Sequence, residues 1–285
     1  MAWTLAAFSK WNCRDGCTKH IQPLSFTFLY LDYAAMDSIS PGQFSLVYNA
    51  FSFTIAVMGA ATVFFFLSRS QVAPPYRTAL TVSGLVTLIA LYHYLRIFNS
   101  WEGAYALVDG RMQPTGAAFN DAYRYVDWLL TVPLLLVELI LVMRLSRAET
   151  IGKATKLGLL AALMVVLGYP GEISSDPGTR WLWWALAMIP FLIILYDLFV
   201  GLKKSIDSQP EGARGLVSAA RWLTVVSWLF YPVVFVFPMI GFTGGAATTA
   251  VQVGYTVADV VAKAVFGVLI FMIAARKSEV ETAVR

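Results

Sequence analysis

The last strongly apolar segment of the sequence, YTVADVVAKAVFGVLIF, has a lysine near its centre. Lys263 follows Asp259 by four residues, so in a helix the two side chains lie on one face, one turn apart. One interpretation is a buried ion pair. The other is covalent capture of a carbonyl cofactor, because a desolvated lysine readily forms a Schiff base. Either interpretation requires this segment to lie inside a protein core.

A second apolar segment, RYVDWLLTVPLLLVEL, contains two carboxylic acids and a threonine. Asp127, Thr131 and Glu138 are spaced by four and seven residues, which places them within about 60° of one another on a helix. The helical rise separates Asp127 from Glu138 by about 16 Å along the axis. Two proton-exchanging groups on one face, with a gap between them, predict a proton path that needs another group in the middle.

Two further ionisable residues lie in the apolar segments. Arg124 is one turn from Asp127, where it could stabilise an ionised carboxylate or, alternatively, extend towards the membrane surface. His93, in LYHYLRIF, is by itself typical of a core histidine whose hydrogen bonds are satisfied. Neither residue decides the function without the surrounding pattern.

Aromatic residues recur in the same apolar segments. They could form a box around a long flat ligand, although at helical spacing such residues are more often ordinary packing. The central lysine in the same set of helices favours the ligand box. The members of this box are Trp128, Trp228, Tyr231, Pro232 and Tyr255.

The composition identifies a membrane protein. Of 285 residues 58% are hydrophobic and 13% are charged, and the mean hydropathy is +0.67. About 20 apolar residues are needed to cross a bilayer as a helix, and continuous runs favour helices over alternating barrel strands. We therefore predict an all-α bundle of seven membrane-spanning helices. The predicted spans are 43–67, 80–98, 123–143, 154–171, 181–202, 222–242 and 250–275, the fourth being the shortest.

The distribution of basic residues predicts the orientation of the bundle. Alternate connections on one side hold Arg69, Arg77, Arg144, Arg147, Lys153, Lys156, Lys203, Lys204, Arg214, Arg276, Lys277 and Arg285. The connections on the other side hold only Arg111 and Arg180. The positive-inside rule then places the C-terminus in the cytoplasm and the N-terminus outside. The net charge of +4 follows from this bias, so it gives no indication of nucleic-acid binding.

The chain divides into an N-terminal extracellular extension, residues 1–40, and one seven-helix domain, residues 41–285. No basic region precedes a clean apolar run in the extension, which disfavours a cleaved signal peptide. Cys13 and Cys17 could form a disulfide, but two isolated thiols make no metal site. The outer connection from Ser100 to Asn120 is the longest, so additional structure is expected there.

Several motifs closely resemble the microbial rhodopsins, the seven-helix proteins that bind retinal. RYVDWLLTVPLL is similar to the third-helix signature of that family, WLFYP to its sixth-helix retinal pocket and DVVAK to its seventh-helix pattern. Asp127, Thr131 and Glu138 resemble the D-T-E pattern of outward proton pumps of the proteorhodopsin and xanthorhodopsin groups. YHYLRIFNSWE, NDAYRYVDW, GYPGE and VQVGYT are most similar to xanthorhodopsin.

The resemblance implies a role for each candidate residue. Lys263 would carry all-trans retinal as a protonated Schiff base. Asp127 would be the counter-ion and proton acceptor, and Asp259 the second counter-ion. Glu138 would be the cytoplasmic proton donor, and His93 would hydrogen-bond the acceptor. The implied protein is a light-driven outward proton pump in the cell membrane of a prokaryote, a transporter and not an enzyme, assembled as a pentamer or trimer.

Two positions of the resemblance distinguish subtypes. Leu135 stands where proteorhodopsins tune their colour, and leucine resembles the green-absorbing type. Trp184 stands where carotenoid-binding xanthorhodopsins have a glycine that opens a window onto the retinal ring. An indole would fill that window, so we expect no carotenoid antenna of that kind.

Four other functions would use a similar bundle of helices. A photosensory rhodopsin that signals to a partner is the main alternative, but it does not need a carboxylic donor at Glu138. A chloride pump would need a neutral residue at 127, and a sodium pump would need asparagine there and aspartate at 131. A membrane protein without a pigment would keep the seven helices and form no colour with retinal.

Overall fold

The computed structural model describes residues 37–120 and 122–283. Seven helical stretches in this part of the chain are long and apolar enough to cross a membrane. Each overlaps one predicted span, so the predicted all-α seven-helix architecture is confirmed. Cys13 and Cys17 lie outside the described residues, as does most of the predicted extension. The seven stretches are Pro41–Gln71, Pro74–Ala104, Ala122–Met143, Arg147–Glu172, Pro177–Gly201, Glu211–Ile240 and Gly245–Thr282.

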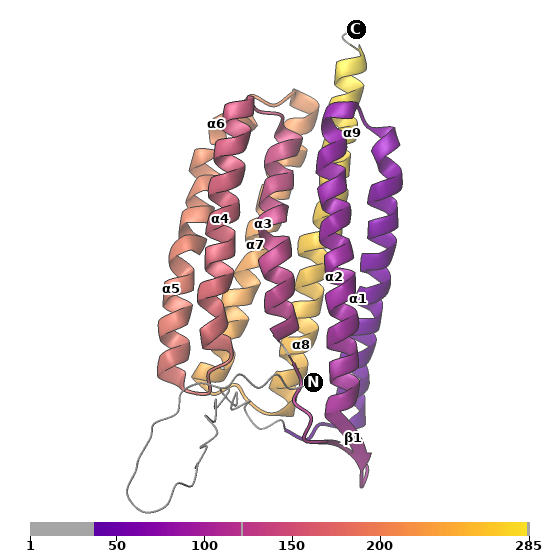
Figure 1. The fold of residues 1–285 in the computed structure, drawn as a ribbon, viewed down its shortest axis with the longest axis vertical. Helices are drawn as coiled ribbons and strands as arrows, with labels where there is room; N and C mark the ends of the chain where they lie inside the picture. The colour runs from indigo at the N-terminus through magenta and orange to yellow at the C-terminus, as the bar shows by residue number, and fades with distance from the viewer. Residues whose placement is uncertain (1–36, 121, 284–285) are drawn as a thin grey trace, which may run out of the picture. The chain divides into compact units, whose positions relative to one another are not determined.

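The long helices run alongside one another, and short turns extend several of them (Figure 1). The α-helices are α1 (Pro41–Ser68), α2 (Arg77–Ala104), α3 (Ala122–Met143), α4 (Arg147–Glu172), α5 (Pro177–Tyr196), α6 (Lys203–Asp207), α7 (Glu211–Val236), α8 (Gly245–Asp259) and α9 (Phe266–Ala283). The 3-10 turns are η1 (Arg69–Gln71), η2 (Pro74–Tyr76) and η4 (Phe237–Ile240), and the π-helical turns are η3 (Asp197–Gly201) and η5 (Val260–Val265).

Polar caps mark where individual helices begin. Ser40 accepts a hydrogen bond from the backbone N–H of Gln43, whose side chain accepts one from the N–H of Ser40, and Pro41 occupies the first turn. This reciprocal arrangement satisfies two donors that the first turn of a helix leaves free. Ser146 caps α4 in a similar way, which extends the fourth span well before its predicted start at residue 154.

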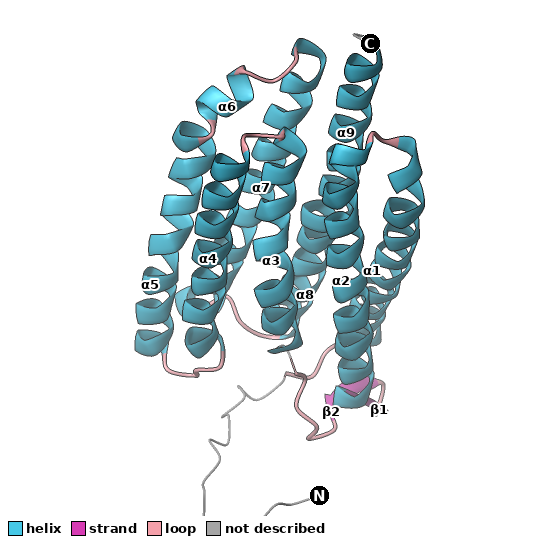
Figure 2. Cartoon of the chain, turned by 45° about the horizontal axis from the view of Figure 1, so that its top comes forward, coloured by secondary structure: helices cyan, strands magenta, loops and turns pink. Residues whose placement is uncertain are grey.

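The connection from Ser100 to Asn120 holds the additional structure that its length predicts. β1 (Tyr105–Val108) and β2 (Arg111–Pro114) pair as an antiparallel hairpin, which Figure 2 shows at the opposite end of the bundle from the C-terminus. Asp109 and Gly110 form its turn with φ of 48° and 76°, the left-handed pair that tight hairpins require. Ile39 pairs with Met112, so the residues just before α1 contact the hairpin.

A buried tyrosine joins the hairpin to the chain that precedes α1. The Tyr105 hydroxyl donates to the backbone oxygen of Asp37 at 3.4 Å. Burial, together with the negative charge of Asp37, raises the pKa of Tyr105 to about 12. The hydroxyl therefore remains a neutral donor at physiological pH.

Burial differs between the centre and the periphery of the bundle. The third and seventh spans are the most buried, and the fourth is the least. Large apolar side chains such as Phe53, Leu67 and Val226 are exposed on the outside, as expected for a surface in contact with lipid. The central position of α3 and of α8–η5–α9 brings their titratable residues together in the core.

Candidate functional site

Lys263 lies at the centre of the bundle between two carboxylates. Its Nζ is 2.6 Å from Oδ2 of Asp127 on α3 and 2.8 Å from Oδ1 of Asp259 on α8. All three side chains are almost completely buried. Lys263 lies on the π-helical turn η5, a local widening of a helix that frequently occurs at functional sites. Because an isolated buried charge is very costly, the three groups stabilise one another.

Asp259 receives hydrogen bonds from three other side chains. The Tyr94 hydroxyl donates to its Oδ2 at 2.7 Å, and the Tyr231 hydroxyl donates to its Oδ1 at 2.6 Å. The indole N–H of Trp128 also donates to Oδ1, at 3.3 Å. Together with Lys263 these donors come from α2, α3, α7 and η5. Asp259 is therefore a fully satisfied carboxylate held from four sides.

Asp127 has fewer partners than Asp259. Its Oδ2 accepts the bond from Lys263, whereas its Oδ1 accepts no hydrogen bond from the described residues. His93 Nδ1 is 3.8 Å from that Oδ1 and lies 2.9 Å from the backbone oxygen of Ile89. At this separation His93 and Asp127 are neighbours without the hydrogen bond that the resemblance implied. Thr131 donates to the backbone oxygen of Asp127 at 2.8 Å, not to its carboxylate.

Arg124 points into the protein. It is 1% exposed, and its guanidinium carbon is 5.6 Å from the ring centre of Phe51 and 5.4 Å from that of Tyr255. These distances are typical of cation–π contacts. The structure therefore contradicts the alternative in which the side chain of Arg124 extends to the membrane surface.

Glu138 lies in a different environment, nearer the end of the bundle at which α9 terminates. It is fully buried, and its Oε2 accepts a hydrogen bond of 2.6 Å from the Ser83 hydroxyl on α2. Its α3 neighbours Leu135, Leu136 and Leu139 are buried as well. Burial among apolar side chains favours the protonated form of a carboxylic acid, and the single neutral donor opposes this only in part.

Sequence reasoning did not find Ser83 and Tyr94. Both are on α2, where Tyr94 directly follows His93 in the sequence and Ser83 stands one turn before Thr87. Ser83 and Thr87, four residues apart in an apolar segment, could have indicated a polar face of this helix directed into the bundle. Tyrosine at this place has no distinctive pattern.

An apolar pocket is lined in part by Lys263. Its walls are rich in aromatic side chains, with Trp128 packed edge-on against Tyr231 at 4.9 Å and Tyr231 stacked on Tyr255 at 5.6 Å. All of the predicted box residues line it, and Asp259 and Lys263 are its only charged lining residues among those described. The lining residues are Tyr125, Trp128, Val132, Leu135, Met164, Val165, Gly168, Trp184, Ala187, Met188, Phe191, Trp228, Tyr231, Pro232, Phe235, Tyr255, Asp259, Ala262 and Lys263.

Trp184 forms part of the pocket wall on α5. Its indole N–H donates to the backbone oxygen of Pro232 at 3.0 Å, and its ring packs edge-on against Trp181 at 5.6 Å. Pro232 has no N–H, so it removes one hydrogen bond within α7, and the bond from Trp184 adds a link between α5 and α7 at the same residue. The indole is thus fixed between α5 and α7 beside the pocket.

The fold and the site define a seven-helix membrane protein in which a buried lysine, paired with two carboxylates, opens into an aromatic pocket. A flat apolar ligand bonded to the lysine nitrogen fits this pocket, because its walls are apolar and the nitrogen is at its margin. The pocket and the charge cluster share Asp259 and Lys263, so they form one site.

Comparisons with known proteins agree with this class. The chain matches the family described as "Bacteriorhodopsin-like protein" over residues 46–277. It is 33% identical over 232 residues to the blue-light absorbing proteorhodopsin of Gamma-proteobacterium Hot 75m4, covering 80% of this chain and 86% of that protein. It is 32% identical over 223 residues to bacteriorhodopsin of Halobacterium salinarum, covering 75% and 79%.

Two solved structures are also similar. Xanthorhodopsin, described as a light-driven ion pump with dual chromophore, is 56% identical with a TM-score of 0.84, covering 87% of this chain and 99% of that one. A thermophilic rhodopsin is 49% identical with a TM-score of 0.84, covering 86% and 99%. The chain therefore belongs to the bacteriorhodopsin-like family, the microbial rhodopsins.

Proposed function

We propose that this protein is a light-driven outward proton pump with retinal bound to Lys263. The observation that carries the proposal is the buried Lys263 between two carboxylates at the margin of an aromatic pocket, with Glu138 on the same face of α3. When bound as all-trans retinal in a protonated Schiff base, the cofactor supplies absorption of visible light and a light-driven change of shape. The protein supplies the proton acceptor, the donor and the direction.

Asp127 is the acceptor in this proposal. Its Oδ2 is 2.6 Å from the Lys263 nitrogen, so a proton can pass between them without an intermediate group. Transfer neutralises both partners, which lowers the electrostatic cost of a buried pair. Asp259 keeps its charge as the second counter-ion, because three neutral donors and the lysine surround it. Arg124 lies one turn from Asp127 and contributes positive charge on the outer side.

Glu138 is the donor that returns a proton to the nitrogen. The helical rise places it about 16 Å from Asp127 along α3, on the other side of Lys263. Basic residues are concentrated at the end of the bundle nearer Glu138, which under the positive-inside rule is the cytoplasmic end. A proton that leaves towards Asp127 and is replaced through Glu138 therefore moves out of the cell.

The protein's place in the cell follows from the same arrangement. We place it in the cell membrane of a prokaryote as a multi-pass protein, with the N-terminus outside and the C-terminus in the cytoplasm. Homo-oligomers, either pentamers or trimers, are the proposed assembly. The solved xanthorhodopsin is described with two chromophores, but here Trp184 occupies the pocket wall, so we propose retinal as the only chromophore.

Light-driven acidification tests the proposed function. Cells that express the protein and receive retinal are illuminated in weakly buffered medium while the external pH is recorded. The pump lowers the external pH, and a protonophore abolishes the change. A photosensory protein would form pigment without any protonophore-sensitive change, and a protein that binds no retinal would remain colourless.

A further inference from the structure

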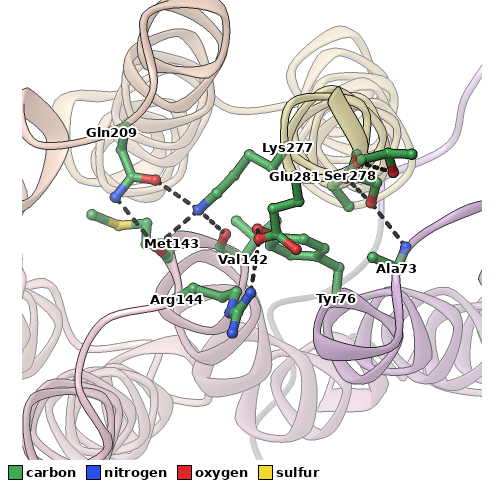
Figure 3. Close-up of polar contacts among 11 residues, drawn as sticks. Ala73, Tyr76, Val142, Met143, Arg144, Gln209, Lys277, Ser278 and Glu281 are labelled. Carbon is green, nitrogen blue, oxygen red and sulfur yellow. Dashed lines mark hydrogen bonds and ion pairs between the residues drawn. The ribbon is translucent and has the colours of Figure 1, made fainter. Parts of the chain in front are cut away.

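A second buried lysine lies outside the site described above. Lys277, on α9, is 5% exposed, and its Nζ donates three hydrogen bonds (Figure 3). The acceptors are the backbone oxygens of Val142 at 3.0 Å and Met143 at 2.9 Å and the Oε1 of Gln209 at 2.8 Å. Gln209, also 5% exposed, donates from Nε2 to Met143 at 3.2 Å. The two side chains thus join the end of α3, the connection between α6 and α7, and α9.

The shape of the chain at the end of α3 explains why a lysine is buried there. Arg144 has a φ of 53°, a left-handed conformation that terminates the helix. The last carbonyl groups of a helix have no partners within the helix and carry partial negative charge. Lys277 satisfies the carbonyl groups of Val142 and Met143 with its ammonium group. This cap connects α3 to α9 instead of closing within α3.

An outer group of contacts covers this cap. Glu281 accepts hydrogen bonds from the Tyr76 hydroxyl at 2.5 Å and from Arg144 Nη1 at 2.7 Å, and Ser278 Oγ accepts one from the N–H of Ala73 at 2.8 Å (Figure 3). The side chains of Arg144 and Glu281 are 44% and 37% exposed, so they face the solvent. Lys277 and Gln209 therefore form the inner, buried layer of this end of the bundle.

The inner layer lies between Glu138 and the solvent. Glu138 precedes Met143 by five residues, which is about 7.5 Å along α3. Leu80 is one turn from Ser83 towards this end, and Ile273 is one turn inward from Lys277. Both belong to the same buried apolar cluster as Leu139. A route along α3 from this end to Glu138 therefore passes the contacts of Lys277 and then an apolar layer.

We propose that Lys277 and Gln209 form a latch that controls the return of a proton to Glu138. The latch rests on the proposed pump function, since only a pump must refill Glu138 from this end. Because the bonds of Lys277 span three separate segments, no gap between these segments can open without breaking at least one bond. Release of the latch limits the rate of proton uptake. Lys277 is a positioning residue in this scheme and exchanges no proton itself.

The test compares proton uptake after a light flash in three single variants and in the double variant of Lys277 and Gln209. The purified protein is reconstituted with retinal, uptake is followed with a pH-indicator dye, and protonation of Glu138 is followed by the infrared absorption of its carboxyl group. Lys277→Met keeps the length of the side chain and removes all three donors. Gln209→Leu removes one acceptor of the latch. Arg276→Met is the matched control, because Arg276 is an exposed neighbour that pairs with Glu279.

We expect uptake to become about tenfold faster in Lys277→Met, which loses all three bonds of the ammonium group, and roughly fivefold faster in Gln209→Leu, which loses only the bond between the two side chains. The double variant should be no faster than Lys277→Met, because both changes open the same latch. The earlier proton transfer from the Lys263 nitrogen to Asp127 should keep its rate in all variants. A purely structural role would lower pigment stability without this selective change.

Wild-type uptake kinetics in Lys277→Met and Gln209→Leu would overturn the latch, as would an equal acceleration in Arg276→Met. If Lys277→Met does not form pigment, Gln209→Leu decides. The wild-type protein tests the proposed function separately. Absence of any light-driven proton movement there refutes the pump itself, whereas a pumping wild type with unaffected variants refutes only the latch.

Discussion

Asp259 and Glu138 are both buried carboxyl groups in one bundle, yet their surroundings are opposite. Asp259 has Tyr94, Tyr231, Trp128 and Lys263 around its two oxygens. Glu138 has only the Ser83 hydroxyl on Oε2, and its Oε1 has no hydrogen-bond partner among the described residues. Burial therefore does not by itself define a carboxyl group's role. Donors maintain a charge, and an apolar layer retains a proton until it is needed.

Asp127 has an intermediate number of hydrogen-bond partners, with one oxygen paired to Lys263 and the other without a described partner. Its replacement has the largest expected effect, because it is both the counter-ion and the proton acceptor in the proposed pump. In Asp127→Asn we expect pumping to fall by at least about a hundredfold and the absorption to shift to the red, because the acceptor and its charge are lost. Absorption spectra and light-driven acidification measure the two effects. Asp109→Asn, in the exposed hairpin turn, is the matched control. An unchanged spectrum in Asp127→Asn would contradict its role as counter-ion.

Glu138→Gln tests the apolar side of the comparison. The colour at rest should be preserved, because Glu138 lies far from Lys263, whereas recovery after a flash should slow by about a hundredfold without the donor. Flash photolysis at neutral pH measures the recovery. Glu149→Gln, near the exposed start of α4, should recover normally. Normal recovery in Glu138→Gln would remove this residue from the donor role.

Ser83→Ala sharpens the comparison by removing the single donor to Glu138. Without the hydroxyl the carboxylate that remains after proton release loses its only described hydrogen-bond donor, so proton return to the Lys263 nitrogen should slow by roughly fivefold. The carboxyl C=O stretch of Glu138 should also move to higher frequency. Ser68→Ala, another buried serine, is the control. Identical infrared spectra in wild type and Ser83→Ala would show that the contact is not made.

Trp184→Gly has the smallest expected effect on pumping, because the described hydrogen bond of Trp184 goes to the backbone of Pro232 and not to a carboxylate. Acidification should remain within about twofold of wild type. If the indole blocks a carotenoid window, an added keto-carotenoid should then extend the action spectrum of pumping. An action spectrum without this extension would contradict the idea that the Trp184 indole is what prevents carotenoid binding.

The sequence predicted the seven spans well, because continuous apolar runs of sufficient length have few alternatives in a bilayer. The motifs also predicted the grouping of Lys263, Asp127 and Asp259. Ser83 had a signal in its spacing from Thr87, whereas Tyr94 had none, because the face that α2 turns towards α3 and α8 depends on packing between helices.

Lys277 is the clearest difference between sequence and structure. From the sequence we grouped Lys277 with Arg276 among the basic residues of the cytoplasmic connections. In the structure Lys277 is buried on α9. The left-handed turn at Arg144 leaves carbonyl groups free at the end of α3, and these attract the ammonium group. A backbone conformation so far away in the sequence gives no local signal near residue 277. His93 is a similar case, since its orientation towards Ile89 depends on local packing.

The central claim is that Lys263 carries the chromophore. The most direct test adds all-trans retinal to the purified protein, records the visible absorption band, reduces the adduct with borohydride and locates the added mass by peptide mass spectrometry. The account predicts a coloured protein with the mass on the peptide that contains Lys263, and no colour in Lys263→Ala. A colourless wild-type protein, or a retinyl group on any other lysine, would contradict it.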